Sequence, residues 1–309
     1  MSTLYLHHPS FAGHKTPPGH PECPDRLRAI DQMLEHEKFQ PLERDSAPYG
    51  SIEQAALAHP EAHVTDIRSA IPASGIVHLD GDTSVSPGSW EAAMRAVGAA
   101  CLAVDEVFQG KVRNAFSAAR PPGHHAEKAR AMGFCLFNNA AVATRWAQTT
   151  YGAERVAIID FDVHHGNGTQ DIFWADRNVL YCSTHQMPLY PGTGAFNETG
   201  TSNNIVNAPL HAGDGSHEFR EAIDTAILPR LDDFRPDLIV ISAGFDAHLR
   251  DPLGGLRLVE ADFAWITNKL MEVADRHCNG RVVSLLEGGY DLDALARCVA
   301  VHVAALMTG

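Results

Sequence analysis

The sequence predicts one α/β domain in which helices cover both faces of a central, mostly parallel sheet. Short runs of β-branched and apolar residues recur along the chain, and longer segments of helical period lie among them. This pattern is typical of parallel sheets, because each crossover between parallel strands usually contains a helix. No low-complexity linker and no internal repeat interrupts the 309 residues, so we expect a single domain over residues 1–309.

Six apolar runs are expected to form strands that are buried on both faces, because their hydrophobicity is continuous rather than alternating. These runs span residues 3–6, 114–117, 156–159, 179–182, 238–241 and 282–286. Five longer segments carry apolar residues at helical spacing and are expected to form helices. They span residues 90–109, 139–148, 217–231, 260–276 and 292–307.

Composition excludes several classes of function. The 38 acidic residues outnumber the 24 basic ones, and the formal charge is −14. We expect no nucleic-acid partner, because phosphate backbones are bound by clustered cations and no basic stripe is present. The sequence shows neither a signal peptide nor a run long enough to span a bilayer, so no membrane association is expected. The six cysteines form no CxxC pair, which is typical of reduced thiols in a cytoplasmic protein.

Polar side chains gather directly after four of the predicted strands. They lie at residues 120–125, 160–165, 243–246 and 287–290. Open α/β sheets bind ligands in the crevice outside the carboxyl ends of their strands. We therefore expect these four segments, which are far apart in sequence, to meet in one cleft.

Asp160, Asp162 and His164 alternate along an extended segment, so their side chains project to the same side. A carboxylate and the imidazole from this segment, together with Asp246, would provide three metal ligands and leave a fourth position open, as in a catalytic zinc site. A lone Asp-x-His is usually a turn or capping feature, but Gly166 and Gly168 indicate a sharp turn where the chain leaves the strand. Two oxygens and one nitrogen accept Zn²⁺, Fe²⁺ or Co²⁺.

Other residues near these turns have both a structural and a catalytic interpretation. His124 and His125 follow a stiff Pro-Pro-Gly segment, which suits positioned acid/base groups as well as a simple turn. Tyr290 follows two glycines and is either a core residue or a hydrogen-bond donor to an oxyanion. Phe134 and Tyr190 lie in loops, where two aromatic rings can form the walls of a narrow tunnel for an alkyl chain.

These motifs resemble those of the histone deacetylase family within the arginase/deacetylase superfamily. The matching segments span residues 20–27, 120–126, 133–139, 160–168, 191–194, 243–248, 251–255 and 287–290. The Glu-Gly-Gly-Tyr form of the last segment and Asn167 are similar to the class II branch, which includes bacterial histone deacetylase-like amidohydrolases. The resemblance implies the arginase/deacetylase α/β fold and a Zn²⁺ ion held by Asp162, His164 and Asp246.

The resemblance also implies a role for each catalytic residue. His125 would activate water as general base and then protonate the leaving amine, His124 would assist electrostatically, and Tyr290 would hydrogen bond the oxyanion. We expect Asp160 to hold His124 in its cationic form. A neutral partner, Asn167, would leave His125 neutral and able to accept a proton.

Further sites follow from the same resemblance. It implies two monovalent cation sites for K⁺ or Na⁺, one around Asp160, Asp162, His164 and Ser183 and one near Phe173 and Val179. Arg26 resembles the arginine of an internal acetate channel. Asp82 is a candidate for the rim carboxylate that anchors the substrate backbone.

The substrate is expected to be an acetylated lysine side chain. Polyamine-specific relatives often carry an acidic gatekeeper where this chain has Leu253, so this leucine favours acyl-lysine. An N-acetylpolyamine or another acetylated small amine remains the alternative, and a catalytically silent acetyl-lysine binder is disfavoured because no ligand and no tyrosine is lost. A binuclear arginase-like site is disfavoured too, because Gly166 stands where a second carboxylate would be needed. The sequence predicts no particular oligomeric state.

Overall fold

The computed structural model describes residues 2–309 and confirms the predicted α/β fold. Its eight-stranded sheet has the order β2-β1-β5-β10-β9-β6-β7-β8, and all neighbouring strands are parallel. The strands are β1 (Thr3–His7), β2 (Glu43–Ser46), β5 (Asn114–Ser117), β6 (Val156–Asp160), β7 (Val179–Gln186), β8 (Ile205–Leu210), β9 (Leu238–Ala243) and β10 (Val282–Leu286). A separate antiparallel pair consists of β3 (Val77–His78) and β4 (Ser84–Val85).

All six predicted strands are present, and the two further strands of the large sheet, β2 and β8, were not predicted and lie at its edges. The short β3–β4 pair was not predicted either. Every residue of β2 is exposed, and its charged sequence suits an edge strand. β8 contains Asn207 and Pro209, and proline is tolerated in a strand mainly at an edge. Neither strand therefore shows the continuous apolar run that marks the central strands.

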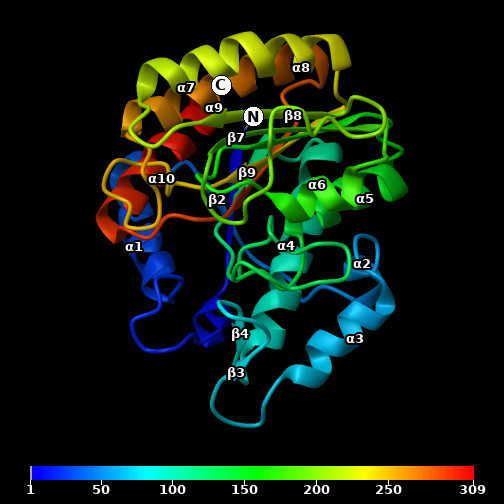
Figure 1. The fold of residues 1–309 in the computed structure, drawn as a ribbon, viewed down its shortest axis with the longest axis vertical. Coiled ribbons are helices and arrows are strands. Elements are labelled where there is room, and N and C mark those ends of the chain that lie inside the picture. The colour runs from blue at the N-terminus through cyan, green and yellow to red at the C-terminus, as the bar shows by residue number, and fades with distance from the viewer. Residues whose placement is uncertain (1) are drawn as a thin grey trace.

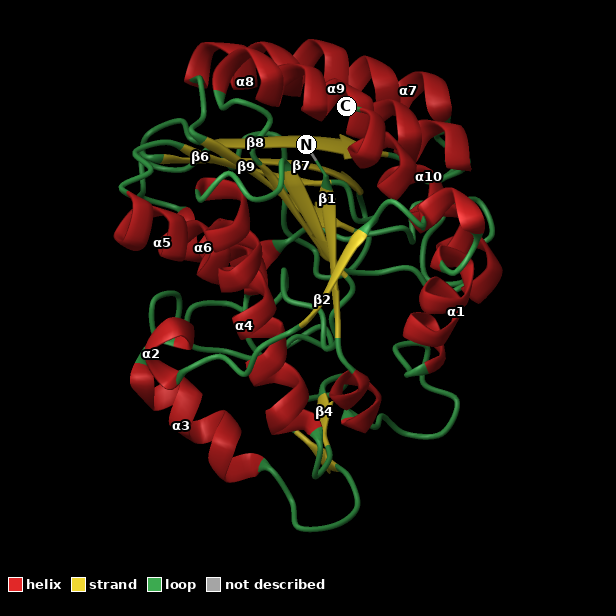
Figure 2. Cartoon of the chain, turned by 180° about the vertical axis from the view of Figure 1, so that it is seen from behind, coloured by secondary structure: helices red, strands yellow, loops and turns green. Residues whose placement is uncertain are grey.

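Helices cover both faces of the sheet, as Figures 1 and 2 show from opposite sides. On one face lie α4 (Ser89–Phe108), α5 (Asn139–Tyr151) and α6 (Asn167–Phe173). On the other lie α7 (Ser216–Ala222), α8 (Leu228–Phe234), α9 (Glu260–His277) and α10 (Leu292–Thr308). A π-helical turn, Ile223–Ile227, joins α7 to α8, so the predicted helix 217–231 is present with a local change of winding.

The remaining helices were not predicted, because they are short or lie among loops. They are α1 (Asp25–Leu34), α2 (Ile52–Ala55) and α3 (Glu61–Ala70), with 3₁₀ turns at Pro9–Gly13 and Glu37–Phe39. α1 packs against α10, and the lower part of the molecule in Figure 1 contains α2, α3 and the β3–β4 pair. No helix within residues 2–309 is long and apolar enough to cross a membrane.

Side-chain caps fix the first turns of two helices that follow site loops. The side chain of Asn138 accepts a hydrogen bond from the Ala141 amide at the start of α5, and Asp291 does the same for Ala294 at the start of α10. The α10 cap directly follows Tyr290, so it also determines where the chain turns after β10.

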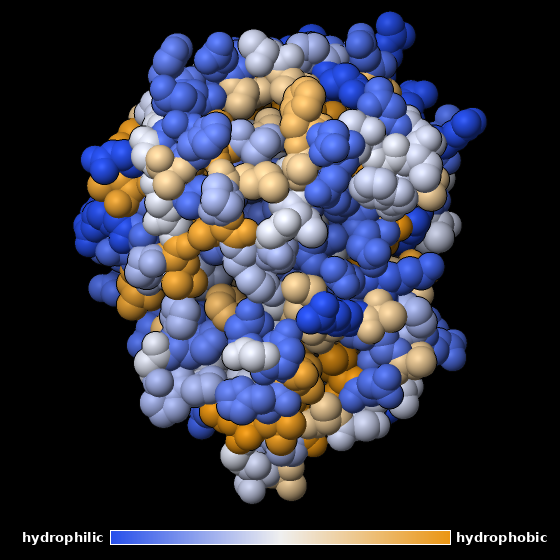
Figure 3. All heavy atoms as spheres, viewed as in Figure 1, coloured by the Kyte–Doolittle hydropathy of each residue, from blue (hydrophilic) through white to orange (hydrophobic). Residues whose placement is uncertain are grey.

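The four polar segments that were predicted to meet follow β5, β10, β9 and β6, which are consecutive neighbours in the sheet. Parallel neighbours end at the same edge, so the segments converge there as expected. On the face of the molecule that is seen in Figure 3, hydrophilic side chains predominate and the apolar areas between them are smaller.

Candidate active site

Asp162, His164 and Asp246 form a buried cluster that suits a metal ion. One potential ligand atom from each residue lies within 4.8 Å of the other two. His164 Nδ1 is 3.1 Å from Asp162 Oδ1 and 3.1 Å from Asp246 Oδ2. Asp160 belongs to the same segment but not to this cluster, so the structure distinguishes two aspartates that alternation alone places on one side.

Backbone amides hold both carboxylates in place. Asp162 accepts hydrogen bonds from the amides of His164 (2.9 Å) and Gly288 (2.8 Å), and Asp246 accepts one from Val163 (2.9 Å). A side chain at position 288 would collide with the carboxylate of Asp246, so only glycine allows the β10 loop to approach so closely. Amide contacts of this kind orient ligands before a metal binds.

The charges in this cluster also fit a divalent cation. Burial tends to lower the pKa of His164, but its hydrogen bonds to Asp162 and Asp246 prevail and raise it to about 10. Burial and the neighbouring Asp162 carboxylate raise the pKa of Asp246 to about 7. Two buried carboxylates beside one imidazole are therefore costly unless a proton or a cation lies between them. Zn²⁺ would take the place of that proton, and one nitrogen with two oxygens is a suitable donor set.

The two histidines after β5 have different partners, as the sequence predicted. His124 Nδ1 donates to Asp160 Oδ2 at 3.0 Å, whereas His125 Nδ1 donates to Asn167 Oδ1 at 2.8 Å. The amide nitrogen of Asn167 donates to Glu127 Oε1 at 2.8 Å, which turns its oxygen toward His125. Because Nδ1 of His125 carries the proton, Nε2 has a free lone pair that can accept one.

Their environments move the two pKa values in opposite directions. Burial alone would lower the pKa of His124, but the carboxylates of Asp160, Asp162 and Glu287 raise it well above its usual value. Burial and the positive charge of His124 lower the pKa of His125 well below its usual value. One imidazole is therefore held as a cation and the other as a neutral base, which is the division that paired acid/base residues need.

Glu287 is the main site residue that sequence reasoning did not assign a role. Its side chain is 1% exposed and accepts hydrogen bonds from the amides of Gly123 (2.6 Å) and His124 (3.1 Å) and from the hydroxyl of Ser242 (3.0 Å). It thus joins the loops after β5, β9 and β10. The sequence signals were an acidic residue directly after a buried apolar strand and its place in the Glu-Gly-Gly-Tyr motif, and neither indicates which groups it binds.

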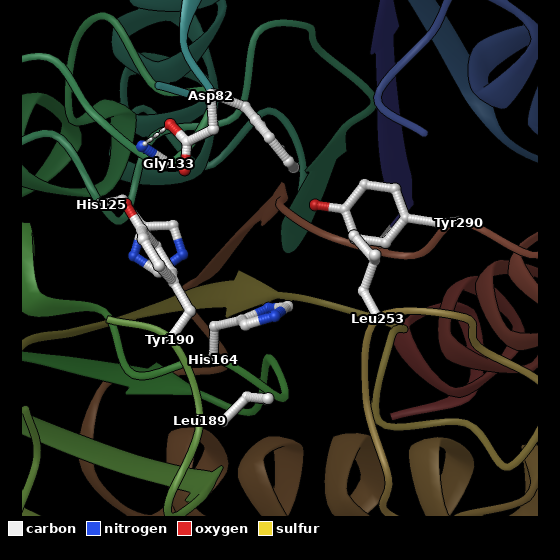
Figure 4. A pocket seen from close by; sticks show the side chains of 9 residues that line it. Asp82, His125, Gly133, His164, Leu189, Tyr190, Leu253 and Tyr290 are labelled. Carbon is white, nitrogen blue, oxygen red and sulfur yellow. Dashed lines mark hydrogen bonds between the residues drawn. The ribbon is translucent and has the colours of Figure 1, made fainter. Parts of the chain in front are cut away.

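A tunnel of about 230 Å³ leads to the cluster. Its lining residues are Asp82, His125, Gly133, Phe134, His164, Leu189, Tyr190, Leu253 and Tyr290. Figure 4 shows the Tyr290 hydroxyl pointing into this space from the side opposite His125. Burial raises the pKa of Tyr290 well above its usual value, so its hydroxyl remains a hydrogen-bond donor.

All four residues that were predicted to bind substrate line this tunnel. The ring of Tyr190 lies edge-on to that of His125, with centroids 5.1 Å apart. Phe134 has a positive φ of 69°, and its amide donates to Thr83 Oγ1 at 3.1 Å. Asp82 accepts from the Gly133 amide at 3.1 Å, so it supports the Gly133–Phe134 turn and also lines the tunnel.

Arg26 lies outside the tunnel lining, in a fully buried group of charged residues. Its guanidinium donates to the backbone oxygens of Gly289 and Glu287 and is 3.4 Å from Glu22 Oε1. Glu22 also accepts hydrogen bonds from Nε and Nη2 of the neighbouring Arg120 guanidinium. The group therefore connects the N-terminal segment to the loops that carry the histidine pair and Tyr290.

The residues that were predicted to form the monovalent cation sites lie near β6 and β7. Ser183 is the register partner of Asp160 on the adjacent strand, and its hydroxyl hydrogen bonds with His185 at 2.9 Å. The backbone oxygens of Phe173 and Val179 do converge, but on the side-chain nitrogen of Asn204.

A side chain at Gly166 would collide with Asp160, so the position leaves no room for the second carboxylate of a binuclear site.

Sequence comparisons with known proteins agree with the geometry of this site. A family model described as histone deacetylase domain matches residues 20–306. A probable deacetylase of Archaeoglobus fulgidus is 38% identical over 318 residues, covering 100% of this chain and 87% of the relative. The histone deacetylase-like amidohydrolase of Pseudomonas aeruginosa is 40% identical over 277 residues, covering 88% of this chain and 73% of the relative.

A comparison with solved structures supports the same fold. A crystal structure titled "Crystal Structure of HDA15 HD domain" is 36% identical, has a TM-score of 0.94, and covers 99% of this chain and 88% of that one. The arrangement of the sheet, the Asp-His-Asp cluster and these relatives all indicate the same assignment. The chain belongs to the histone deacetylase family.

Proposed function

We propose that this protein is a metal-dependent amidohydrolase that removes acetyl groups from lysine side chains. The proposal rests on one observation. Two histidines with opposite protonation preferences lie beside the three residues that could hold a metal ion, at the end of a narrow tunnel. Asp162, His164 and Asp246 would hold Zn²⁺, and Fe²⁺ or Co²⁺ suits the same donor set. Bound there, Zn²⁺ would polarise the acyl carbonyl and acidify a water molecule.

The protein's own side chains would move the protons. His125 takes a proton from the attacking water at Nε2 and later delivers it to the leaving amine. His124, held as a cation by Asp160, stabilises the negative charge that develops nearby, and Asn167 keeps Nδ1 of His125 protonated. Tyr290 donates a hydrogen bond to the oxygen of the former carbonyl, opposite the histidines.

The tunnel lining supports a lysine side chain as the group that enters. Phe134 and Tyr190 would pack against its methylene chain, and Asp82 at the mouth would accept a hydrogen bond from a substrate amide. Leu253 adds no charge at the mouth, which favours a neutral alkyl chain beneath a peptide. The Asp82 carboxylate would equally attract an ammonium group, and this favours an N-acetylpolyamine or another acetylated small amine as the second candidate.

Side-by-side assays test both candidates. Zinc-loaded wild type is compared with Asp246→Ala on an acetyl-lysine peptide and on N-acetylputrescine, with the exposed Asp233→Ala as matched control. We expect peptide turnover by wild type and Asp233→Ala, and loss of both turnover and bound zinc in Asp246→Ala. Preference for N-acetylputrescine would establish the second candidate. Full zinc binding without turnover of any acetyl amide would contradict the proposed reaction.

We also infer a monovalent cation near the carboxyl end of β6, beside the middle of β7, held by backbone oxygens of Asp160, Asp162 and His164 with Ser183. Asp160 and Ser183 are register partners there, which supports a shared site. Replacing K⁺ and Na⁺ by tetramethylammonium at constant ionic strength should then lower the melting temperature of the wild type. An unchanged melting temperature would argue against this site.

A further inference from the structure

The side-chain amide of Asn204 lies where three backbone carbonyls converge. Asn204 directly precedes β8 and is 4% exposed. Its Nδ2 is 2.9 Å from the carbonyl oxygen of Phe173, 3.2 Å from that of Asp176 and 3.1 Å from that of Val179. These carbonyls come from the end of α6, the turn after it and the start of β7, so one side chain ties three segments together.

Hard monovalent cations bind in cages of this kind, because carbonyl oxygens can replace the hydration shell of the ion. Phe173 and Val179 are also the residues at which the family resemblance implies a second K⁺ or Na⁺ site. An amide nitrogen at about 3 Å from all three oxygens offers only two hydrogens, so one hydrogen bond must be shared. No space remains for an ion that contacts the same three oxygens.

The orientation of the amide is determined by its two ends. Asn204 Oδ1 is buried and has no hydrogen-bond partner within the described chain, and it lies against Gly200, where an added Cβ would come within 2.6 Å of it. If the amide were reversed, its oxygen would face three carbonyl oxygens and its nitrogen would lose all three acceptors. The nitrogen therefore belongs inside the cage.

A positively charged side chain, Arg145, already lies beside the cage. The guanidinium of Arg145 lies 4.7 Å from the centroid of the Phe173 ring and forms an ion pair with the carboxylate of Asp176. The carboxylate of Asp176, whose backbone oxygen belongs to the cage, is thus neutralised by the chain itself. An additional cation would gain little from it and would meet the repulsion of Arg145.

We propose that the Asn204 amide takes the place of a monovalent cation in this cage, so that this protein lacks the second K⁺ or Na⁺ site. The end of α6 is then anchored by a covalent part of the chain, whatever the salt. α6 begins at Asn167, the partner of His125, so the same anchor holds the helix that orients the histidine.

Counting bound Rb⁺, a K⁺ analogue, tests the proposal on the full-length, zinc-loaded protein. Wild type is compared with Asn204→Ala, which empties the cage, and with Asn204→Asp, which places an anion in it. The exposed neighbour Ser202→Ala is the matched control. Equilibrium dialysis with elemental analysis gives the number of Rb⁺ ions per chain, and melting temperatures in KCl, NaCl and tetramethylammonium chloride give an independent readout.

We expect each Asn204 variant that folds to bind one more Rb⁺ per chain than wild type and Ser202→Ala. Its melting temperature should rise by about 2–4 °C more than that of wild type when K⁺ replaces tetramethylammonium. Equal Rb⁺ counts in wild type and both variants would overturn the proposal. So would a wild-type protein that binds two Rb⁺ ions, since its cage would then hold an ion beside the amide.

Discussion

Replacement of Glu287 should show how much the histidine pair depends on one buried carboxylate. In Glu287→Ala the amides of Gly123 and His124 lose the acceptor that lies 2.6 and 3.1 Å from them. Leaving a buried donor without a partner costs about 1–3 kcal/mol, so two amides predict a loss of about 2–6 kcal/mol in the free energy of unfolding. Because the same amides position the histidines, kcat should also fall while KM changes little.

Glu287→Gln is the informative comparison. Its side-chain oxygen can still accept from both amides, and its nitrogen can donate to the hydroxyl of Ser242, so the geometry is kept and only the charge is removed. We expect a change of about 1 kcal/mol or less in stability near pH 5 and a kcat close to that of wild type. Urea unfolding, zinc content and steady-state kinetics of the three proteins provide the assay.

The pH dependence of this pair has a definite sign. Burial raises the pKa of Glu287 to about 7, so its protonated form is favoured in the folded state. The stability that this proton contributes is complete below the unfolded pKa of about 4.5 and is lost as the pH rises through about 7. Glutamine has no such proton. As the pH rises through this range, the free energy of unfolding of Glu287→Gln should therefore increase by up to about 3 kcal/mol relative to that of wild type. A glutamine variant as damaged as the alanine variant would refute the geometric role of Glu287.

Three further predictions concern other residues. Asn167→Asp places a carboxylate beside His125 and should raise the pKa of that histidine, so the acidic limb of the pH–rate profile moves to higher pH; an unmoved limb would contradict the pairing. Leu253→Glu should shift kcat/KM toward N-acetylputrescine over an acetyl-lysine peptide, and an unchanged ratio would show that this position does not set preference. Burial lowers the pKa of His302 to about 3, so stability above pH 6.5 is lost as the pH falls toward 3. His302→Gln should therefore resist acid unfolding better than wild type in circular dichroism, and equal acid sensitivity would exclude this histidine as a cause.

Local pattern was sufficient for the central strands, the long helices and the position of the cleft. Continuous apolar runs identify strands that are buried on both faces, and polar residues after such strands lie at their carboxyl ends. Pattern alone placed Asp160 and Asp162 on the same side and could not separate their roles. In the structure the amides of His164 and Gly288 hold Asp162 toward the metal cluster, while Asp160 faces His124.

The α/β class, the four site segments and, through the motifs, the family can all be predicted from the residues alone. The folded chain is needed to see that Glu287 holds the loop of the histidine pair and that Asn204 lies inside a cage of carbonyls. Each contact joins segments that are distant in sequence, and each exists because a buried polar group must find a partner. Which partner it finds depends on the order of the strands and the path of the loops, and periodicity along the chain carries no information about either.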